Sequence, residues 1–480
     1  MNRWLKARWF SLLGRHGLRT RRLEFALKNF RKSAEQEPHN VFTAAEIAWC
    51  LHQLKDVQGA IDIYQRVLEQ RPNYASAHAN FGMALAAVQR YQEAVDELRR
   101  AIRMQPKLKD RWYWDYNLGT FLAHLERGEE AIEPLCQSIE LKPREASTHF
   151  WLGRAYAQVQ RHTEAVEQFK EALKLQPNEA DSLYAMGISL AELRQFDKAA
   201  DAYKQAITFR PEYADAHFNL GVASGELGRT EEEIQAYKKA VELDPQDVKG
   251  LVNLAITYST SKKHELALET WGKVIELQPC VESFVSRSID YERLGRYDEA
   301  LADAKAVLQL APDSAEAHGN VGVFLNRLGD SENALREARE AMRLNPDYPD
   351  AYFLAGSAMQ GLDFHERSIS EYQKALSLKP DYWEALVNLG NAYLELDRDK
   401  EAVAPLQLAI ELRPDCLEAH DFLGVAYLRT NDRESAKQQF QILKNLDSSF
   451  AGALRKLMDA ESLTTNNHGQ SVPPNPKLGS

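Results

Sequence analysis

Histidine, cysteine and acidic side chains are the groups of this 480-residue chain that could hold a metal ion or catalyse a reaction. His264 and Glu265 match the start of the H-E-x-x-H zinc motif, but no second histidine follows four residues after the first. The chain also lacks the glycine-rich phosphate loop and the calcium-loop pattern. We therefore predict no catalytic residue, no metal site and no cofactor.

Five of the thirteen histidines recur at one phase of a 34-residue repeat. They are His78, His149, His217, His318 and His420. Because they lie two or more repeats apart, and a helix layer is about 10 Å thick, they are separated by tens of ångströms. We predict that they are half-buried packing residues.

The four cysteines are Cys50, Cys136, Cys280 and Cys416, far apart and without a C-x-x-C pair. This spacing favours neither disulfides nor a zinc cluster, so we expect a reducing, cytoplasmic location. No apolar run approaches the roughly 18 residues that a membrane span needs.

Short amphipathic helices must position these groups, and residues 146–179 show the pattern. Leu152 and Tyr156 recur at helical spacing in the first half, Phe169 lies on the apolar face of the second half, and Pro177 stops the second helix. Such a helix pair buries one apolar face and leaves another uncovered. It therefore needs a similar pair stacked against it.

Prolines mark the ends of successive units, at intervals of 34 residues with one interval of 37 and one of 33. They are Pro38, Pro72, Pro106, Pro143, Pro177, Pro211, Pro245, Pro279, Pro312, Pro346, Pro380 and Pro414. When this proline is numbered 32, position 8 is Gly in ten units and position 20 is Ala in eleven. Small residues at two fixed positions indicate a close helix crossing in each unit.

These residues resemble the tetratricopeptide repeat, whose signature has Leu-Gly at positions 7 and 8, Tyr at 11, Ala at 20, an aromatic residue at 24, Ala at 27 and Pro at 32. The resemblance covers about residues 7 to 450. It implies an all-α, right-handed superhelical solenoid of about 13 helix-turn-helix repeats with a C-terminal capping helix. It also implies that the first helix of each pair lies on the concave face.

The periodicity predicts the following boundaries. A basic N-terminal segment and divergent first repeat occupy residues 1–40, and the array continues to 450 as 41–74, 75–108, 112–145, 146–179, 180–213, 214–247, 248–280, 281–314, 315–348, 349–382, 383–416 and 417–450. Residues 451–463 are expected to form the capping helix. Residues 464–480 are polar and proline-rich and are expected to be disordered.

Asparagine recurs at position 6 of the first helix, although it is a poor helix-interior residue. The six residues are Asn80, Asn117, Asn219, Asn253, Asn320 and Asn388. An amide can pair with the backbone of an extended peptide of any sequence, and this row is similar to the asparagine ladder of O-linked N-acetylglucosamine transferase repeats. The alternative is repeat consensus without a ligand, and both interpretations stay open.

Aromatic residues accompany the asparagines in four consecutive repeats. They are Tyr113, Tyr116, Phe150, Trp151, Tyr184 and Phe218. Aromatic side chains anchor peptides through large contacts at low entropic cost, so this segment is our first candidate for a peptide-binding surface. The family's carboxylate clamp is not expected, because position 5 never carries Lys.

The charge is unevenly distributed. The formal net charge of −11 argues against a nucleic-acid partner. Residues 1–32, however, carry ten Lys or Arg against Glu24 alone. A divergent capping repeat is the favoured interpretation of this segment, while contact with an anionic membrane or a targeting role stays open.

Together these patterns predict a non-enzymatic scaffold or adaptor that binds extended peptide segments in a concave groove. The alternative is a membrane-docked assembly factor or co-chaperone recruited through the basic N-terminal segment. The sequence gives no indication of the oligomeric state, which stays open.

Overall fold

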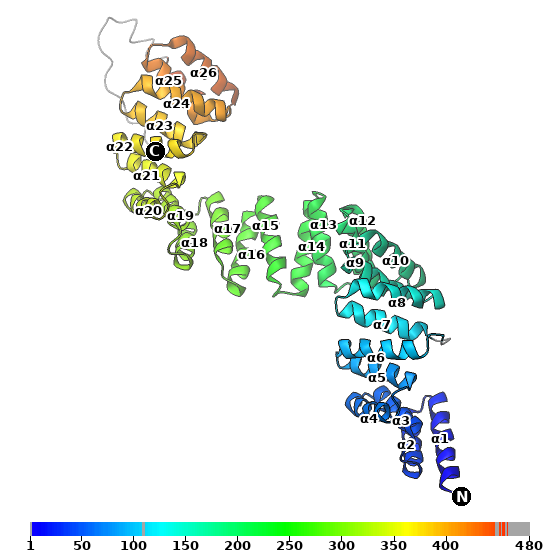
Figure 1. The fold of residues 1–480 in the computed structure, drawn as a ribbon. Helices are drawn as coiled ribbons and strands as arrows, with labels where there is room; N and C mark the ends of the chain where they lie inside the picture. Colours follow the sequence, from blue (N-terminus) through cyan, green and yellow to red (C-terminus); the bar gives the residue numbers. More distant parts are fainter. Residues whose placement is uncertain (1, 108–110, 447–450, 453, 457, 459–480) are drawn as a thin grey trace, which may run out of the picture. The chain divides into compact units, whose positions relative to one another are not determined.

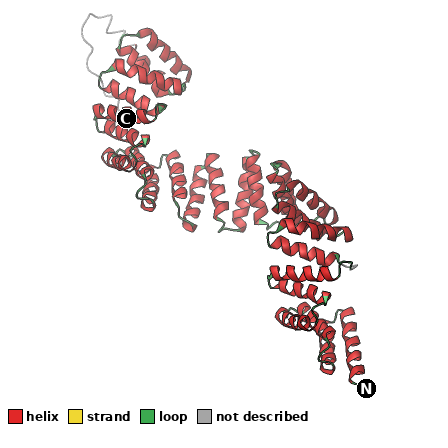
Figure 2. Ribbon diagram, in the orientation of Figure 1, coloured by secondary structure: helices red, strands yellow, loops and turns green. Residues whose placement is uncertain are grey.

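The computed structural model describes residues 2–107, 111–446, 451–452, 454–456 and 458. These residues form helices joined by short turns, and there is no strand among them (Figure 2). The all-α fold predicted from the sequence is confirmed. The chain separates into two units, Met1–Gly250 and Leu251–Ser480, each of which is a run of helix pairs.

The helices are labelled along the chain in Figure 1. In the first unit they are α1 (Arg3–Arg19), α2 (Leu23–Gln36), α3 (Val41–Gln53), α4 (Val57–Gln70), α5 (Ala75–Ala87), α6 (Tyr91–Met104), α7 (Trp112–His124), α8 (Gly128–Leu141), α9 (Ala146–Gln158), α10 (His162–Leu175), α11 (Ala180–Glu192), α12 (Phe196–Phe209), α13 (Ala214–Glu226) and α14 (Thr230–Leu243). Helix α15 (Val248–Thr260) begins at the end of the first unit and continues into the second. The second unit then contains α16 (His264–Leu277), α17 (Val281–Arg293), α18 (Tyr297–Leu310), α19 (Ala315–Arg327), α20 (Ser331–Leu344), α21 (Pro349–Gly361), α22 (His365–Leu378), α23 (Trp383–Glu395), α24 (Asp399–Leu412), α25 (Leu417–Arg429) and α26 (Arg433–Leu446).

Within each unit the helices pack in chain order, and the second helix of one pair also packs on the first helix of the next. The first helices of successive pairs contact each other directly as well, as α7, α9, α11 and α13 do in the first unit and α19 and α21 do in the second. Successive second helices show no comparable packing in the part of the chain that is described. The first helices from α3 to α13 in the first unit, and those from α19 to α25 in the second, therefore each form a continuous layer.

The close crossing expected at position 8 is a contact with the large residue at position 24. A Cβ added to Gly153 would lie 2.7 Å from the Phe169 ring, and one added to Gly187 would lie 2.5 Å from the Tyr203 ring. Phe169 and Tyr203 are buried in the core. In these repeats glycine at position 8 thus makes room for the aromatic ring that joins the two helices of a pair, and in others, such as the one with Gly119, it makes room for a leucine.

A left-handed residue ends the first helix of every pair. Gln160 (φ 61°) stands between α9 and α10, and the amide of Arg161, next in the chain, donates to the Tyr156 carbonyl at 2.9 Å. The same position has positive φ throughout the array, and glycine occupies it only at Gly228, Gly295 and Gly329. This C-terminal cap satisfies carbonyls of the first helix and reverses the chain.

The first pair follows the repeat scheme. Helices α1 and α2 pack together, and Gly14 faces the buried Phe30 ring as Gly153 faces Phe169. At the other end, residues 451–452, 454–456 and 458 of the expected capping helix are helical, and Leu454 is buried against Gly424. The rest of that segment and the expected disordered tail at 464–480 lie outside the described residues.

Candidate peptide-binding surface

The position 6 asparagines of the first unit are engaged inside the protein. Asn117 is buried and its amide donates to the Tyr113 carbonyl at 2.5 Å, one helical turn earlier. The half-buried Asn219 donates to the Tyr184 hydroxyl at 2.9 Å and so links α13 to α11. In both residues the amide nitrogen already has a partner.

Two further asparagines face a buried tyrosine of the preceding repeat. Burial raises the pKa of Tyr64, and the amide of Asn80 beside its hydroxyl opposes that rise. Burial likewise raises the pKa of Tyr372, and Asn388 opposes it. Both amides thus lie close to the tyrosine hydroxyl of the preceding repeat.

The remaining two asparagines lie in the second unit. Asn253 also interacts within the chain. Asn320 is half-buried, and its amide has no hydrogen bond among the described residues. The six positions are therefore not a uniform row of free amides, and the resemblance to an asparagine ladder stays a prediction.

Three of the position 5 aromatic residues of the first unit pack in the same way. Phe150 lies 6.0 Å from the Phe169 ring, and Tyr184 lies 6.0 Å from the Tyr203 ring. Phe218 lies 5.6 Å from the Tyr237 ring of its own repeat. Each ring is half-buried, with one part on the core and the rest accessible.

Tyr116 and Trp151 join two neighbouring first helices, whereas Tyr113 contacts its own helix. Tyr113 is exposed and stacks on Tyr116, with ring centroids 6.5 Å apart. Burial raises the pKa of Tyr116, whereas the Trp151 side chain from the next first helix lowers it by interacting with the hydroxyl. Trp151 also lies 4.7 Å from the His124 ring.

Two cations cover this aromatic surface. The Arg154 guanidinium is 5.0 Å from the centre of the Trp151 ring, and the Lys249 ammonium is 4.9 Å from the centre of the Phe218 ring. Both cations are exposed. The arrangement can offer apolar ring faces next to positive charge, which suits a segment carrying apolar and acidic groups.

The recurring histidines join one repeat to the previous one. The Nε2 of each ring lies within hydrogen-bonding distance of the carbonyl of the proline at position 32 of the preceding repeat. The pairs are His78 with Pro72 (2.8 Å), His149 with Pro143 (3.1 Å), His217 with Pro211 (3.0 Å), His318 with Pro312 (3.2 Å) and His420 with Pro414 (2.9 Å). The Tyr352 hydroxyl donates to the Pro346 carbonyl in the same way, at 3.0 Å. The histidines therefore hold repeats together as well as filling space.

The hydrogen-bond partner of the other ring nitrogen, Nδ1, favours the protonated form of His78. Its Nε2–H donates to the Pro72 carbonyl, and its Nδ1 contacts the Glu97 carboxylate, which can only accept. The hydrogen bond to Glu97 raises the pKa of His78 although burial lowers it. In the repeat at 146–179, Gln168 replaces the acid, with its amide 2.9 Å from the His149 Nδ1. That amide can turn to donate, so a neutral ring satisfies both partners there.

We expect Glu97→Gln to remove a pH-dependent part of the stability of the first unit. Because the folded pKa of His78 is raised, its stabilisation is complete below the unfolded value of about 6.5 and is lost as pH rises through the folded value. Urea unfolding at about pH 6 and pH 8 measures this difference. The reverse variant, Gln168→Glu, is the matched control and should add such a dependence. Equal pH profiles for Glu97→Gln and the unaltered chain would contradict the assignment.

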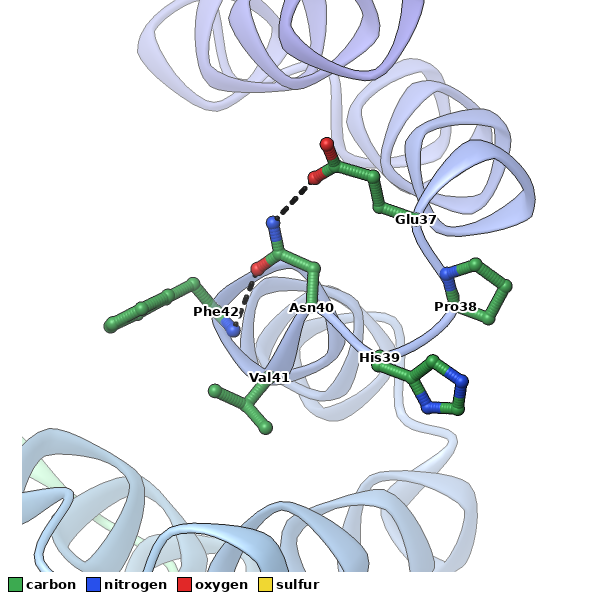
Figure 3. Close-up of a pocket in the computed structure, with 6 residues that line it drawn as sticks. All are labelled: Glu37, Pro38, His39, Asn40, Val41 and Phe42. Atoms are coloured by element: carbon green, nitrogen blue, oxygen red, sulfur yellow. Dashed lines mark hydrogen bonds between the residues drawn. The ribbon is translucent and has the colours of Figure 1, made fainter. Parts of the chain in front are cut away.

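One pocket lies where α2 meets α3, lined by Glu37, Pro38, His39, Asn40, Val41 and Phe42 (Figure 3). The Asn40 side chain accepts from the Phe42 and Thr43 amides, which caps α3, and donates to Glu37 at 3.0 Å. These polar groups are thus occupied by the turn itself. Elsewhere among the described residues, no group of three or more His, Cys, Asp or Glu side chains could hold a metal ion.

Family models described as tetratricopeptide repeats match most of the array. One model matches three segments, residues 11–75, 184–248 and 286–349. Four others match residues 51–113, 144–212, 236–269 and 384–416, one segment each. A model described as TPR repeat matches residues 365–397. The chain belongs to the tetratricopeptide-repeat family. Proteins of this family are typically non-enzymatic scaffolds for protein interactions.

Solved structures with a similar arrangement include other tetratricopeptide-repeat proteins. YrrB, described as a TPR protein with an unusual peptide-binding site, is 26% identical over 39% of this chain and 95% of its own, with a TM-score of 0.36. Yeast Tom70 is 15% identical over 94% of this chain and 99% of its own, with a TM-score of 0.34. A chain of the Cut9–Hcn1 hetero-tetramer is 14% identical over 88% of this chain and 96% of its own, with a TM-score of 0.38.

The search of curated proteins found no match. Every described helix is too short or too polar to cross a bilayer. The cytoplasmic location and the absence of a nucleic-acid partner stay predictions.

Proposed function

We propose that this protein is a non-enzymatic scaffold that binds extended segments of other proteins along the first helices of residues 112–247. The observation that supports this proposal most is the row of partly accessible aromatic rings on α7, α9, α11 and α13. These four helices contact one another in succession, so the rings belong to one layer. The concave groove implied by the family resemblance would lie along this layer.

The spacing of the layer suits an extended ligand. Packed helices lie about 8–10 Å apart, and an extended chain advances about 3.3 Å per residue. One aromatic contact for about every three ligand residues follows from these values. Arg154 and Lys249 beside Trp151 and Phe218 favour ligand segments that carry acidic groups between the apolar ones.

The asparagines contribute through the side-chain atoms that remain available. Asn219 uses its nitrogen on Tyr184, which leaves its carbonyl oxygen to accept from a peptide N–H group. Asn117 likewise keeps its side-chain carbonyl oxygen for a ligand. Because Asn117 is buried, it is the weaker candidate of the two asparagines. The aromatic residues therefore carry most of the proposed affinity.

Trp151→Ala combined with Phe218→Ala is expected to weaken capture of the partner segments by at least about tenfold, because truncating two central anchors typically costs more than 1 kcal/mol each. Crosslinking and affinity purification with the full chain would first identify the bound segments. Titration of those peptides then gives the change in Kd.

Phe353→Ala is the matched control for this pair. Phe353 packs 6.0 Å from the Tyr372 ring in the second unit, as Phe218 packs on Tyr237 in the first. Its loss should disturb a repeat to a similar extent without touching the proposed surface, and circular dichroism checks helicity in all variants. Unchanged capture by the Trp151 and Phe218 variant would refute this location.

A second candidate is the membrane-docked assembly factor or co-chaperone recruited through the basic segment. The observation that favours it is that none of the ten Lys and Arg side chains of residues 1–32 forms an ion pair with a described residue. Later in the chain, arginines at the start of second helices pair with a glutamate three residues on, as Arg90 does with Glu93 and Arg161 with Glu164. Flotation of the full chain with anionic and with neutral vesicles tests this candidate.

A further inference from the structure

Helix α1 has one buried side and one side that carries large apolar residues. Ala7, Gly14 and Gly17 are buried, and Gly14 and Gly17 face residues of α2. On the other side, four large residues are about half exposed: Trp4 (53%), Leu5 (48%), Trp9 (55%) and Leu12 (54%). Leu5, Trp9 and Leu12 are spaced by four and three residues and so lie along one stripe of the helix, and Trp4 lies beside that stripe.

Arginines share that exposed side. Arg8, Arg15 and Arg19 are spaced by seven and four residues, and all three are exposed. The Arg8 guanidinium lies 5.2 Å from the centre of the Trp4 ring. Arg3, Lys6, Arg21 and Arg22 are exposed around the same helix. A helix that lies at a membrane surface combines large apolar residues such as Trp and Leu with exposed basic residues, and α1 carries both, with its arginines beside the apolar stripe.

We infer that α1 docks in the plane of an anionic bilayer, with Trp4, Leu5, Trp9 and Leu12 entering the headgroup boundary and the arginines contacting lipid phosphates and carboxylates. This inference rests on the second candidate function and names its surface and its partner. The helix has 17 residues and a basic face, and a helix of this kind lies along the bilayer instead of crossing it.

The positive charge on the exposed side of α1 favours an anionic bilayer over other binding partners. A second copy of α1 on this face would bring two sets of exposed arginines together, which repel. A neutral apolar helix would leave the same arginines unpaired at an interface. An anionic bilayer supplies negative charge and an apolar boundary layer at once, and tryptophan is enriched at that boundary.

The test uses the full chain and two kinds of vesicle. One is phosphatidylcholine alone, and the other contains about one third phosphatidylserine, an anionic lipid that attracts basic segments. We expect flotation only with the anionic vesicles. We also expect quenching of tryptophan fluorescence by lipids brominated near the headgroup, since Trp4 and Trp9 would lie within reach. Absence of both signals would overturn the inference.

Two variants separate the apolar from the electrostatic contribution. Trp4→Ala with Trp9→Ala is expected to lower partitioning by about tenfold or more and to remove the bromolipid quenching. Arg8→Glu with Arg15→Glu and Arg19→Glu is expected to abolish flotation. The charge-matched control is Arg103→Glu with Arg144→Glu and Lys238→Glu, three exposed cations outside α1 that form no ion pair among the described residues. Equal loss in this control would overturn the assignment to α1, and circular dichroism verifies folding throughout.

The two parts of the proposed function fail separately in these experiments. The Trp4 and Trp9 variant should still capture partner peptides, because α1 lies outside residues 112–247. If flotation fails while peptide capture persists, the membrane inference and the second candidate function are both wrong, and the scaffold proposal stands. If chemical crosslinking joins α1 to a second copy or to an acidic protein, and vesicles do not compete, the face is a protein interface and the inference is overturned.

Discussion

Replacing Asp290 by alanine is expected to lower the free energy of unfolding of the second unit by about 3 kcal/mol or more. Asp290 is 1% exposed and accepts three hydrogen bonds: from the Ser259 hydroxyl at 2.5 Å, the His264 Nδ1 at 2.7 Å and the Trp271 indole at 3.1 Å. Removing the acceptor leaves the buried Trp271 indole and two half-buried donors without a partner, and a buried donor without a partner costs about 1–3 kcal/mol.

The effect should also reach beyond the single residue. The donors lie on α15 and α16 and the acceptor on α17, so the cluster joins two successive repeats. The stability of a repeat array depends on such interfaces between neighbours. We therefore expect urea unfolding of the Asp290→Ala variant to become broader or to separate into two steps, as measured by circular dichroism and by the fluorescence of Trp271.

Two variants check this prediction. Asp290→Asn keeps the shape and one acceptor oxygen, and its loss of stability should be smaller. Asp298→Ala removes an exposed acid from the first turn of α18 and should change the free energy of unfolding by less than about 0.5 kcal/mol. A similar small change for Asp290→Ala would mean that the cluster does not hold the two repeats together.

Much of the fold could be predicted from the sequence because the same positions make the same kind of contact in many repeats. Gly153 and Phe169 occupy fixed positions in the repeat, and the structure places them against each other. The left-handed turn at Gln160 was not predicted, since its position holds Lys, Gln, Glu, Arg, Asp or Asn in most repeats and Gly in only three. Backbone geometry imposed by the neighbouring helices, more than residue type, determines that turn.

The candidate surface was harder to predict in detail. The aromatic residues could be found by type and spacing, but how much of each ring the core covers depends on the residue at position 24. The partners of Asn219 and His78 lie in the preceding repeat or on the other helix of the pair. A periodic pattern of residue types does not say which of them bond across a repeat.

A second polar contact, within the repeat at 281–314, did leave a signal in the sequence. The repeat at 281–314 has Ser288 where most repeats have glycine, and Arg287 where they have Leu, Phe or Val. It also has Ala304 where a large residue is usual. Three departures in one repeat indicate that a different kind of contact replaces the usual apolar one.

That contact is the ion pair between Arg287 and Asp303, and breaking it from either side is expected to destabilise the second unit by about 3–5 kcal/mol. The Arg287 Nε and Nη2 donate to the two carboxylate oxygens of Asp303 at 2.8 and 2.6 Å. The Asp303 side chain is only 5% exposed, so Arg287→Leu leaves a carboxylate enclosed without its partner. Urea unfolding of the single variants measures both losses.

The double variant Arg287→Leu with Asp303→Leu is expected to recover most of that loss, because a buried ion pair can be replaced by apolar side chains at little net cost. Leu at position 7 also restores the residue type that most repeats have, and Ala304 leaves room beside it. The double-mutant cycle should therefore give a coupling energy of about 2 kcal/mol or more. The exposed pair Arg296 and Glu299 is the control and should show almost no coupling. If the two single losses simply add in the double variant, the ion pair is not what holds α17 and α18 together.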